Sequence, residues 1–156
     1  RLRPSMKIEY STDYALVKAI LSHPDNWYYV SDDFCESIEQ FEPRQGNGFH
    51  YYLVTEDEKP AGCLMLVQVS TIALELHAAL TPDFKGDKSK SVLDGLREVI
   101  RADIPAAKRL RVFIPAWNKR AMSAAIKSGL EFMGIEKEGS AKDGALHDLI
   151  LFGVRI

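Results

Sequence analysis

The chain has 156 residues, of which 46% are hydrophobic and 27% are charged, and its formal net charge is −2. These values predict a single soluble globular domain that is long enough to bury its own core. The charge does not favour nucleic acid or an anionic membrane surface as a partner. No apolar run reaches the ~20 residues that a helix needs to span a bilayer.

Cysteine and histidine usage gives no indication of a metal site. Cys35 and Cys63 do not have the spacing of metal ligands, and the four histidines lie far apart in the sequence. We expect both thiols to be reduced and buried in a cytoplasmic protein. Residues 1–5 precede Met6, the expected natural start, and are expected to be an added remnant, which leaves residues 6–156 as one domain.

The N-terminal quarter predicts one strand and two helices. Residues 6–10 form the expected strand, and Ser11 or Thr12 can cap a helix that Pro24 stops. A second, short helix is expected around residues 32–41, in a segment rich in acidic side chains.

Three strands follow a loop over residues 43–48. The first two, 49–55 and 61–69, are joined by a turn over residues 56–60 and form an antiparallel hairpin. The third strand, over residues 71–80, begins almost at once, so the three are expected to form a meander.

The third of these strands carries two ionisable groups on one face. Alternation places Glu75 and His77 together, opposite the apolar side chains. The apolar side chains expected on the buried face are Ile72, Leu74, Leu76, Ala78 and Leu80.

The turn after this strand is basic and leads into a helix. Residues 82–90 begin with a proline and contain three lysines, and the apolar spacing that follows predicts a helix over residues 88–102. The N–H groups and the positive dipole end of such a helix suit the binding of phosphates. Alternatively, Ser91 and Asp94 form a capping box on an ordinary surface helix.

The last third predicts a strand, a helix and two more strands. The helix should turn Met122, Ala125 and Ile126 inward and end at Gly129. The expected bounds are 109–114 for the strand, 119–128 for the helix, 131–137 and 145–156 for the final strands, and 138–144 for a loop between them.

The element order is therefore β-α-α-β-β-β-α-β-α-β-β. It has too many adjacent strands for a doubly wound sheet, and βαβ crossovers occur only in its second half. The order predicts an α/β (α+β) fold, with a single mixed, mostly antiparallel sheet of six to seven strands and about four helices on both faces.

Two stretches in this order resemble the GCN5-related N-acetyltransferase (GNAT) superfamily, and the likeness runs from Met6 to the C-terminus. The stretch Pro82-Asp-Phe-Lys-Gly-Asp-Lys-Ser-Lys90 is similar to the P-E-Y-R-G-K-G-x-G turn that holds the coenzyme A pyrophosphate in that family. Residues 118–130 are similar to the family's N-x-x-A-x-x-x-Y-x-x-x-G-F stretch.

The resemblance implies acetyl-CoA as cosubstrate, with no metal. It implies that the fourth and fifth strands splay apart, that main-chain groups of Ala79, Leu80 and Thr81 bind the pantetheine arm, and that an N–H near Ala79 or Leu80 polarises the thioester carbonyl. Asn118 can bond the pantetheine or cap the following helix. The residues implied at the pyrophosphate are Lys85, Gly86, Asp87, Lys88, Ser89 and Lys90.

The sequence departs from the family pattern at three positions. Lys88 and Lys90 replace two glycines of the pyrophosphate turn, where glycine lets the backbone approach the phosphates closely. Ala125 occupies the position of a tyrosine that protonates the departing thiolate in many family members. Catalysis would therefore need another acid or water, or it has been lost.

The resemblance also indicates a base and an acceptor site. Several family members place a general base on the fourth strand, where Glu75 and His77 stand; His77 titrates nearer neutrality, and Glu75 would need a raised pKa or a relaying water. Alternatively, the two residues pair with each other or face solvent. Trp27, Asp32 and Asp33 fall in the segment that lines the acceptor site in the family. The alternative is a core aromatic cluster beside a solvated helix face, and for the aromatic group this alternative is favoured.

Two functions follow as hypotheses. The first is an acetyl-CoA-dependent N-acetyltransferase that transfers the acetyl group directly to a small-molecule or peptide amine, with a possible homodimer as its assembly. The second is a catalytically degenerate GNAT-fold binding or assembly protein. Short motifs at Val30–Asp33, Pro115–Asn118 and Lys142–Asp148 resemble small GNAT-like proteins of tailed bacteriophages, which would place the protein in the host cytoplasm, with phage head assembly as one role.

Overall fold

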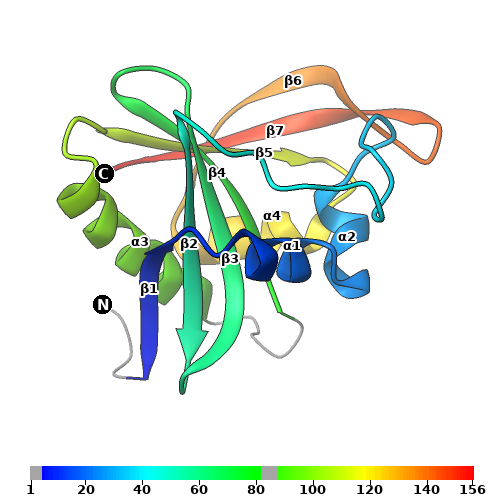
Figure 1. Ribbon diagram of the computed structural model, residues 1–156. Coiled ribbons are helices and arrows are strands. Elements are labelled where there is room, and N and C mark those ends of the chain that lie inside the picture. Colours follow the sequence, from blue (N-terminus) through cyan, green and yellow to red (C-terminus); the bar gives the residue numbers. More distant parts are fainter. Residues whose placement is uncertain (1–4, 82–87) are drawn as a thin grey trace.

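A seven-stranded mixed sheet organises the molecule in the computed structural model, which describes residues 5–81 and 88–156. The strand order is β1-β2-β3-β4-β5-β7-β6 (Figure 1). The strands are β1 (Met6–Ser11), β2 (Phe49–Glu56), β3 (Lys59–Gln68), β4 (Ala73–Leu80), β5 (Arg109–Pro115), β6 (Glu131–Lys142) and β7 (Ala145–Arg155). Every neighbouring pair is antiparallel except β4 and β5.

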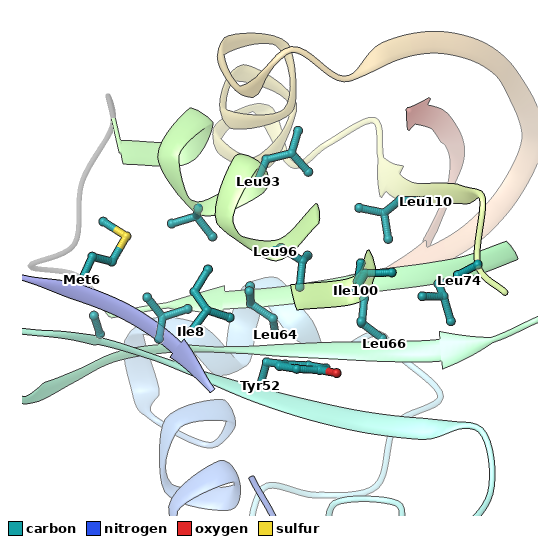
Figure 2. Packing of buried hydrophobic residues seen from close by; sticks show 14 residues of the cluster. Met6, Ile8, Tyr52, Leu64, Leu66, Leu74, Leu93, Leu96, Ile100 and Leu110 are labelled. Carbon is teal, nitrogen blue, oxygen red and sulfur yellow. The ribbon is translucent and has the colours of Figure 1, made fainter. Parts of the chain in front are cut away.

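Helices cover both faces of this sheet. The helices are α1 (Tyr14–Leu21), α2 (Pro24–Val30), α3 (Ser89–Asp103) and α4 (Lys119–Ser128). On one face, Leu96 and Ile100 of α3 pack on β3 in the main core cluster (Figure 2). On the other face, Val17 of α1 packs against Tyr51 and Cys63. The predicted fold class is confirmed.

Strand alternation produces these two cores. Tyr51 and Tyr52 are neighbours on β2, yet Tyr51 joins the cluster under α1 and Tyr52 the cluster under α3. Successive side chains of a strand point to opposite faces, so β2 contributes a buried side chain to each core. Burial raises the pKa of Tyr51 to about 12 and that of Cys63 to about 12, so the Cys63 thiol is no nucleophile near neutrality.

The second helix is not where the sequence analysis expected it. Pro24 does not merely end the first helix: it is the first residue of α2, and residues 31–48 form neither helix nor strand. Proline suits the first turn of a helix because its missing N–H has no partner there. The expected helix over residues 32–41 does not form, and Asp32 accepts the N–H of Phe34 at 2.8 Å, a local contact that competes with helix formation.

The expected loop over residues 138–144 is also wrong. β6 continues to Lys142, and only Asp143 and Gly144 form the turn to β7, with φ values of 54° and 75°. An Asp-Gly pair readily adopts two successive positive φ angles, as a two-residue hairpin turn requires. The hairpin turn after β2 is shorter than expected as well, because Asp57 and Glu58 alone lie between β2 and β3.

Several side chains expected inside are exposed. Ile126 of α4 is 63% exposed, and Cys35 and Ala78 are also exposed. β4 begins at Ala73, so Ile72 precedes the strand and is exposed too. Both cysteines are free thiols.

Within the described ranges, no helix is both long and apolar enough to cross a membrane.

We predict that Leu96→Ala lowers the free energy of unfolding by about 2–5 kcal/mol, because Leu96 is fully buried and its removal leaves a cavity under α3. Ile126→Ala is the matched control and should change stability by no more than about 0.5 kcal/mol. Denaturant unfolding monitored by circular dichroism measures both. Equal effects of the two substitutions would contradict this description of the core.

Candidate active site

The sheet opens between β4 and β5. These strands pair only through Ala73–Arg109, Leu74–Leu110 and Glu75–Arg111. Beyond Glu75, β4 continues to Leu80 beside β3, and β5 continues to Pro115 beside β7. The gap that the family resemblance implied is therefore present, and Figure 1 shows the two strands diverging.

The hydrogen bonds of β4 identify which backbone groups face the gap. Thr81 donates its N–H to Ala61 of β3 at 2.8 Å, and the carbonyl of Ala73 accepts from Val69 after β3 at 3.1 Å. In an antiparallel ladder, alternate residues turn to the same neighbour, so odd-numbered residues of β4 bond to β3. Even-numbered residues point the other way, as the carbonyl of Ile72 does when it accepts from Arg109 at 3.0 Å.

The backbone groups of Ala78 and Leu80 therefore point into the gap, where β5 no longer pairs with β4. Of the two N–H groups that the sequence analysis named, that of Leu80 faces the gap. Ala79 turns its backbone to β3, and its side chain is buried with Cys63.

Glu75, His77 and Arg111 form a charged cluster at the apex of the gap. His77 Nε2 lies 2.9 Å from Glu75 Oε2, and Arg111 Nε lies 3.8 Å from Glu75 Oε1. The hydrogen bond from His77, helped by the charges of His77 and Arg111, lowers the pKa of Glu75 despite its partial burial. This is opposite to the raised pKa that Glu75 would need as a general base. The alternative that the two residues pair with each other is what the structure shows.

The basic turn is described only at its end. Residues 82–87, which include Lys85, Gly86 and Asp87, lie outside the described residues. Lys88 pairs with Glu56 of β2 at 2.6 Å, and Lys90 pairs with Asp94 at 3.0 Å. The predicted Ser91–Asp94 capping box is wrong, because α3 already begins at Ser89. The N-cap residue is Lys88, and a lysine side chain carries no acceptor for the N–H groups of the first turn.

Asn118 and Ala125 lie on the β5 side of the gap. Asn118 is buried, and its Oδ1 accepts the N–H of Ala121 at 3.1 Å, so it caps α4. A contact with pantetheine would have to use the remaining amide groups. Ala125 packs with Ile114, Ile150 and Phe152, and this packing fills the space around it with apolar side chains.

The three residues expected at the acceptor site are engaged in local contacts. Trp27 packs on Phe41 with ring centroids 5.2 Å apart. Asp33 accepts the N–H groups of both Asp143 and Gly144 at 2.8 Å, which fastens residues 31–33 to the β6–β7 turn. Asp32 closes its own turn, as described above. The structure therefore places Asp33 beside the β6–β7 hairpin.

Lys142 was missed by the sequence analysis, which found nothing distinctive in Ser140, Lys142 and Asp143. The ammonium of Lys142 is buried and donates to the carbonyls of Tyr28 at 2.6 Å and Ser31 at 3.0 Å. It also lies 4.1 Å from the centroid of the Tyr28 ring and 5.3 Å from that of Trp117. Lys142 lies at the end of β6, where the sequence predicts a loop, so the alternation of a strand could not identify it.

Tyr28 and Asp143 complete this connection. The hydroxyl of Tyr28 donates to Asp143 Oδ2 at 2.7 Å, and this hydrogen bond raises the pKa of Tyr28. Hydrogen bonds from Lys142 to Tyr28 and Ser31, and from Tyr28 to Asp143, therefore connect the end of α2 to β6 and to the turn that follows it. No group of three or more His, Cys, Asp or Glu side chains in the described ranges has the arrangement of metal ligands.

We predict that Lys142→Met destabilises the fold by about 1–3 kcal/mol, because the carbonyls of Tyr28 and Ser31 lose their donor inside the protein. Lys137→Met on the same strand is the matched control: its side chain is exposed and should contribute less than about 1 kcal/mol. Thermal or denaturant unfolding measures both. A Lys142 variant as stable as the Lys137 variant would show that this buried contact is not needed.

Comparison with known proteins gives structural matches alone. No family model and no curated protein matches the sequence. The structure of spermidine N-acetyltransferase from Vibrio cholerae, in complex with CoA and spermine, matches with a TM-score of 0.75 and 12% identity, over 98% of this chain and 96% of that one.

Two ribosomal protein acetyltransferases match more of the backbone. An acetyl transferase from Salmonella typhimurium that modifies the N-terminal serine of ribosomal protein L7/L12 has a TM-score of 0.80 and 18% identity, over 100% and 98% of the two chains. RimL, a ribosomal L7/L12 alpha-N-protein acetyltransferase in complex with coenzyme A, has a TM-score of 0.79 and 16% identity, over 100% and 97%. At these identities the likeness concerns the backbone, and the chain has the GNAT fold.

Proposed function

We propose that the protein transfers an acetyl group from acetyl-CoA to an amine. The observation that carries the proposal is the gap between β4 and β5, into which unpaired backbone groups of β4 point. Structures with the same fold include enzymes that bind CoA and acetylate a polyamine or a ribosomal protein. A strand edge inside a sheet needs hydrogen-bond partners, and an amide-containing pantetheine arm can supply them.

The residues on the β4 side fit this cosubstrate. The N–H groups of Ala78 and Leu80 would hold the pantetheine and the thioester carbonyl, and the start of α3 at Ser89 would face the pyrophosphate. Acetyl-CoA supplies the activated acetyl group when it is bound. Roles for Lys85, Gly86, Asp87, Lys88, Lys90, Thr81 and Asn118 in the same binding site remain predictions from the sequence.

His77 is the better candidate for the base. With Nε2–H donated to Glu75, a neutral imidazole keeps its lone pair on Nδ1, where it can take a proton from the acceptor amine. Ionised Glu75 would orient the ring and stabilise the imidazolium that forms, as a carboxylate does beside a catalytic histidine. The Leu80 N–H would stabilise the negative charge that develops on the carbonyl oxygen.

A second candidate function is binding without catalysis. The observation that favours it is the apolar packing of Ala125, which leaves no phenol at the position of the family's tyrosine. The departing sulfur would then have to take its proton from solvent in an active enzyme. The protein would then be a binding or assembly factor with the GNAT fold. A role in phage head assembly, a homodimer and a location in the host cytoplasm remain predictions.

We predict that acetyl-CoA at ~100 times its Kd stabilises the fold by about 2.7 kcal/mol. For a domain of this size the melting temperature should rise by about 5–10 °C. Differential scanning fluorimetry with and without acetyl-CoA makes the comparison, and AMP serves as a control for nonspecific nucleotide binding. An unchanged melting temperature at millimolar acetyl-CoA would contradict the proposal.

We also predict that His77→Ala lowers kcat by about 10²–10⁴-fold, because it removes the proton acceptor. Glu75→Gln should lower kcat as well, whereas Glu98→Gln on the exposed face of α3 should not. The assay is release of free coenzyme A thiol across a panel of amines. Wild-type rates equal to buffer would favour binding without catalysis, and full activity of the His77 variant would exclude His77 as the base.

The pH dependence of stability tests the pair independently of activity. Because folding lowers the pKa of Glu75, its ionised form stabilises the fold above the unfolded value near ~4.3. This contribution is lost as the pH falls through the lower, folded value. Wild type should therefore melt above Glu75→Gln at pH 6, and the difference should shrink toward pH 3. A constant difference over this range would show that the carboxylate charge is not responsible.

A further inference from the structure

Arg111 is the cation at the apex of the gap whose hydrogen-bonding groups are left for a ligand. Its side chain is 41% exposed and makes no hydrogen bond to any described residue. Its Nε is buried without a partner, 3.8 Å from Glu75 Oε1, and its guanidinium lies 5.7 Å from the Phe113 ring centroid. These contacts orient the guanidinium and leave its terminal N–H groups to bind another acceptor.

The carboxylate beside this cation is already engaged, because Glu75 is hydrogen-bonded to His77. The apex cluster of Glu75, His77 and Arg111 has a summed charge of zero with neutral His77 and is positive with protonated His77. Such a cluster disfavours a polycation and favours a ligand that brings its own negative charge.

Arg111 also stands beside the proposed base. Glu75 and Arg111 are the last paired residues before β4 and β5 diverge, and His77 follows on β4. His77 and Arg111 contact the two oxygens of the same carboxylate. A ligand that meets both side chains therefore carries its amine and its anion only a few bonds apart.

We propose that Arg111 binds a carboxylate of the acceptor, so that the acceptor is an amino acid or short peptide with a free carboxylate near its amine. Guanidinium and carboxylate match in geometry and form two parallel charged hydrogen bonds. The assignment of this ligand as an acceptor rests on the proposed acetyl transfer, whereas its binding at Arg111 does not.

The experiment compares ligands that differ by one charge. Calorimetry measures the affinity for a panel of amino acids and dipeptides. Each compound is tested both as the free acid and as its C-terminal amide, and spermidine serves as the polycationic comparison. The free carboxylate should bind about tenfold tighter or better than the amide to the wild-type chain. In Arg111→Gln this ratio should fall to about one, and in Arg111→Lys it should lie between. Arg109→Gln is the matched control, because it removes the same charge two residues earlier on β5.

The outcomes separate this proposal from the proposed acetyl transfer. Equal affinity for acids and amides, preference for spermidine, no binding by any member of the panel, or an unchanged ratio in Arg111→Gln would overturn the role of Arg111. A preserved carboxylate preference without any effect of acetyl-CoA on the melting temperature would retain the Arg111 site and reject acetyl transfer. If Arg109→Gln also loses the preference for a free carboxylate, the preference comes from the overall positive charge of β5, and a specific contact with Arg111 is excluded.

Discussion

The divergence of β4 and β5 is the constraint on which the rest of this structure depends. β4 keeps its full ladder with β3, and β5 keeps its full ladder with β7, so neither strand can turn to close the gap without breaking bonds on its other side. The backbone groups of Ala78 and Leu80 consequently lack a partner on β5. Backbone polar groups inside a protein need partners, so the gap is built to be filled by water or by a ligand with amide groups.

The same divergence determines which side chains can act on a bound molecule. Glu75 and Arg111 lie at the last point of contact between the strands, and His77 lies just beyond it. The contact between His77 and Glu75 holds the imidazole against the carboxylate. The terminal N–H groups of the Arg111 guanidinium are left to bind a ligand. The attachment of α2 to β6 through Lys142, and of Asp33 to the β6–β7 turn, is a separate structural feature.

The single mixed sheet and the order of the elements along the chain could be predicted from the sequence, because alternation and helical spacing are strong in β2 to α4. The position of β7 between β5 and β6 was not predicted. The grouping of Glu75 with His77 also followed from alternation alone. The helix expected over 32–41 failed because Asp32 and Asp33 bond backbone N–H groups locally and across to the hairpin, which a composition argument does not reveal. The contacts of Lys142 and Arg111 depend on residues more than thirty positions away, and no local pattern reports them.

Nuclear magnetic resonance of the backbone amides tests the central claim, that β4 holds coenzyme A through the groups facing β5. On addition of coenzyme A, the amide resonances of Ala78 and Leu80 should shift strongly, together with those at the start of α3. Those of Ala79 and Thr81, already bonded to β3, should shift less. Strong shifts confined to other parts of the sheet, or no shifts at millimolar coenzyme A, would contradict the account.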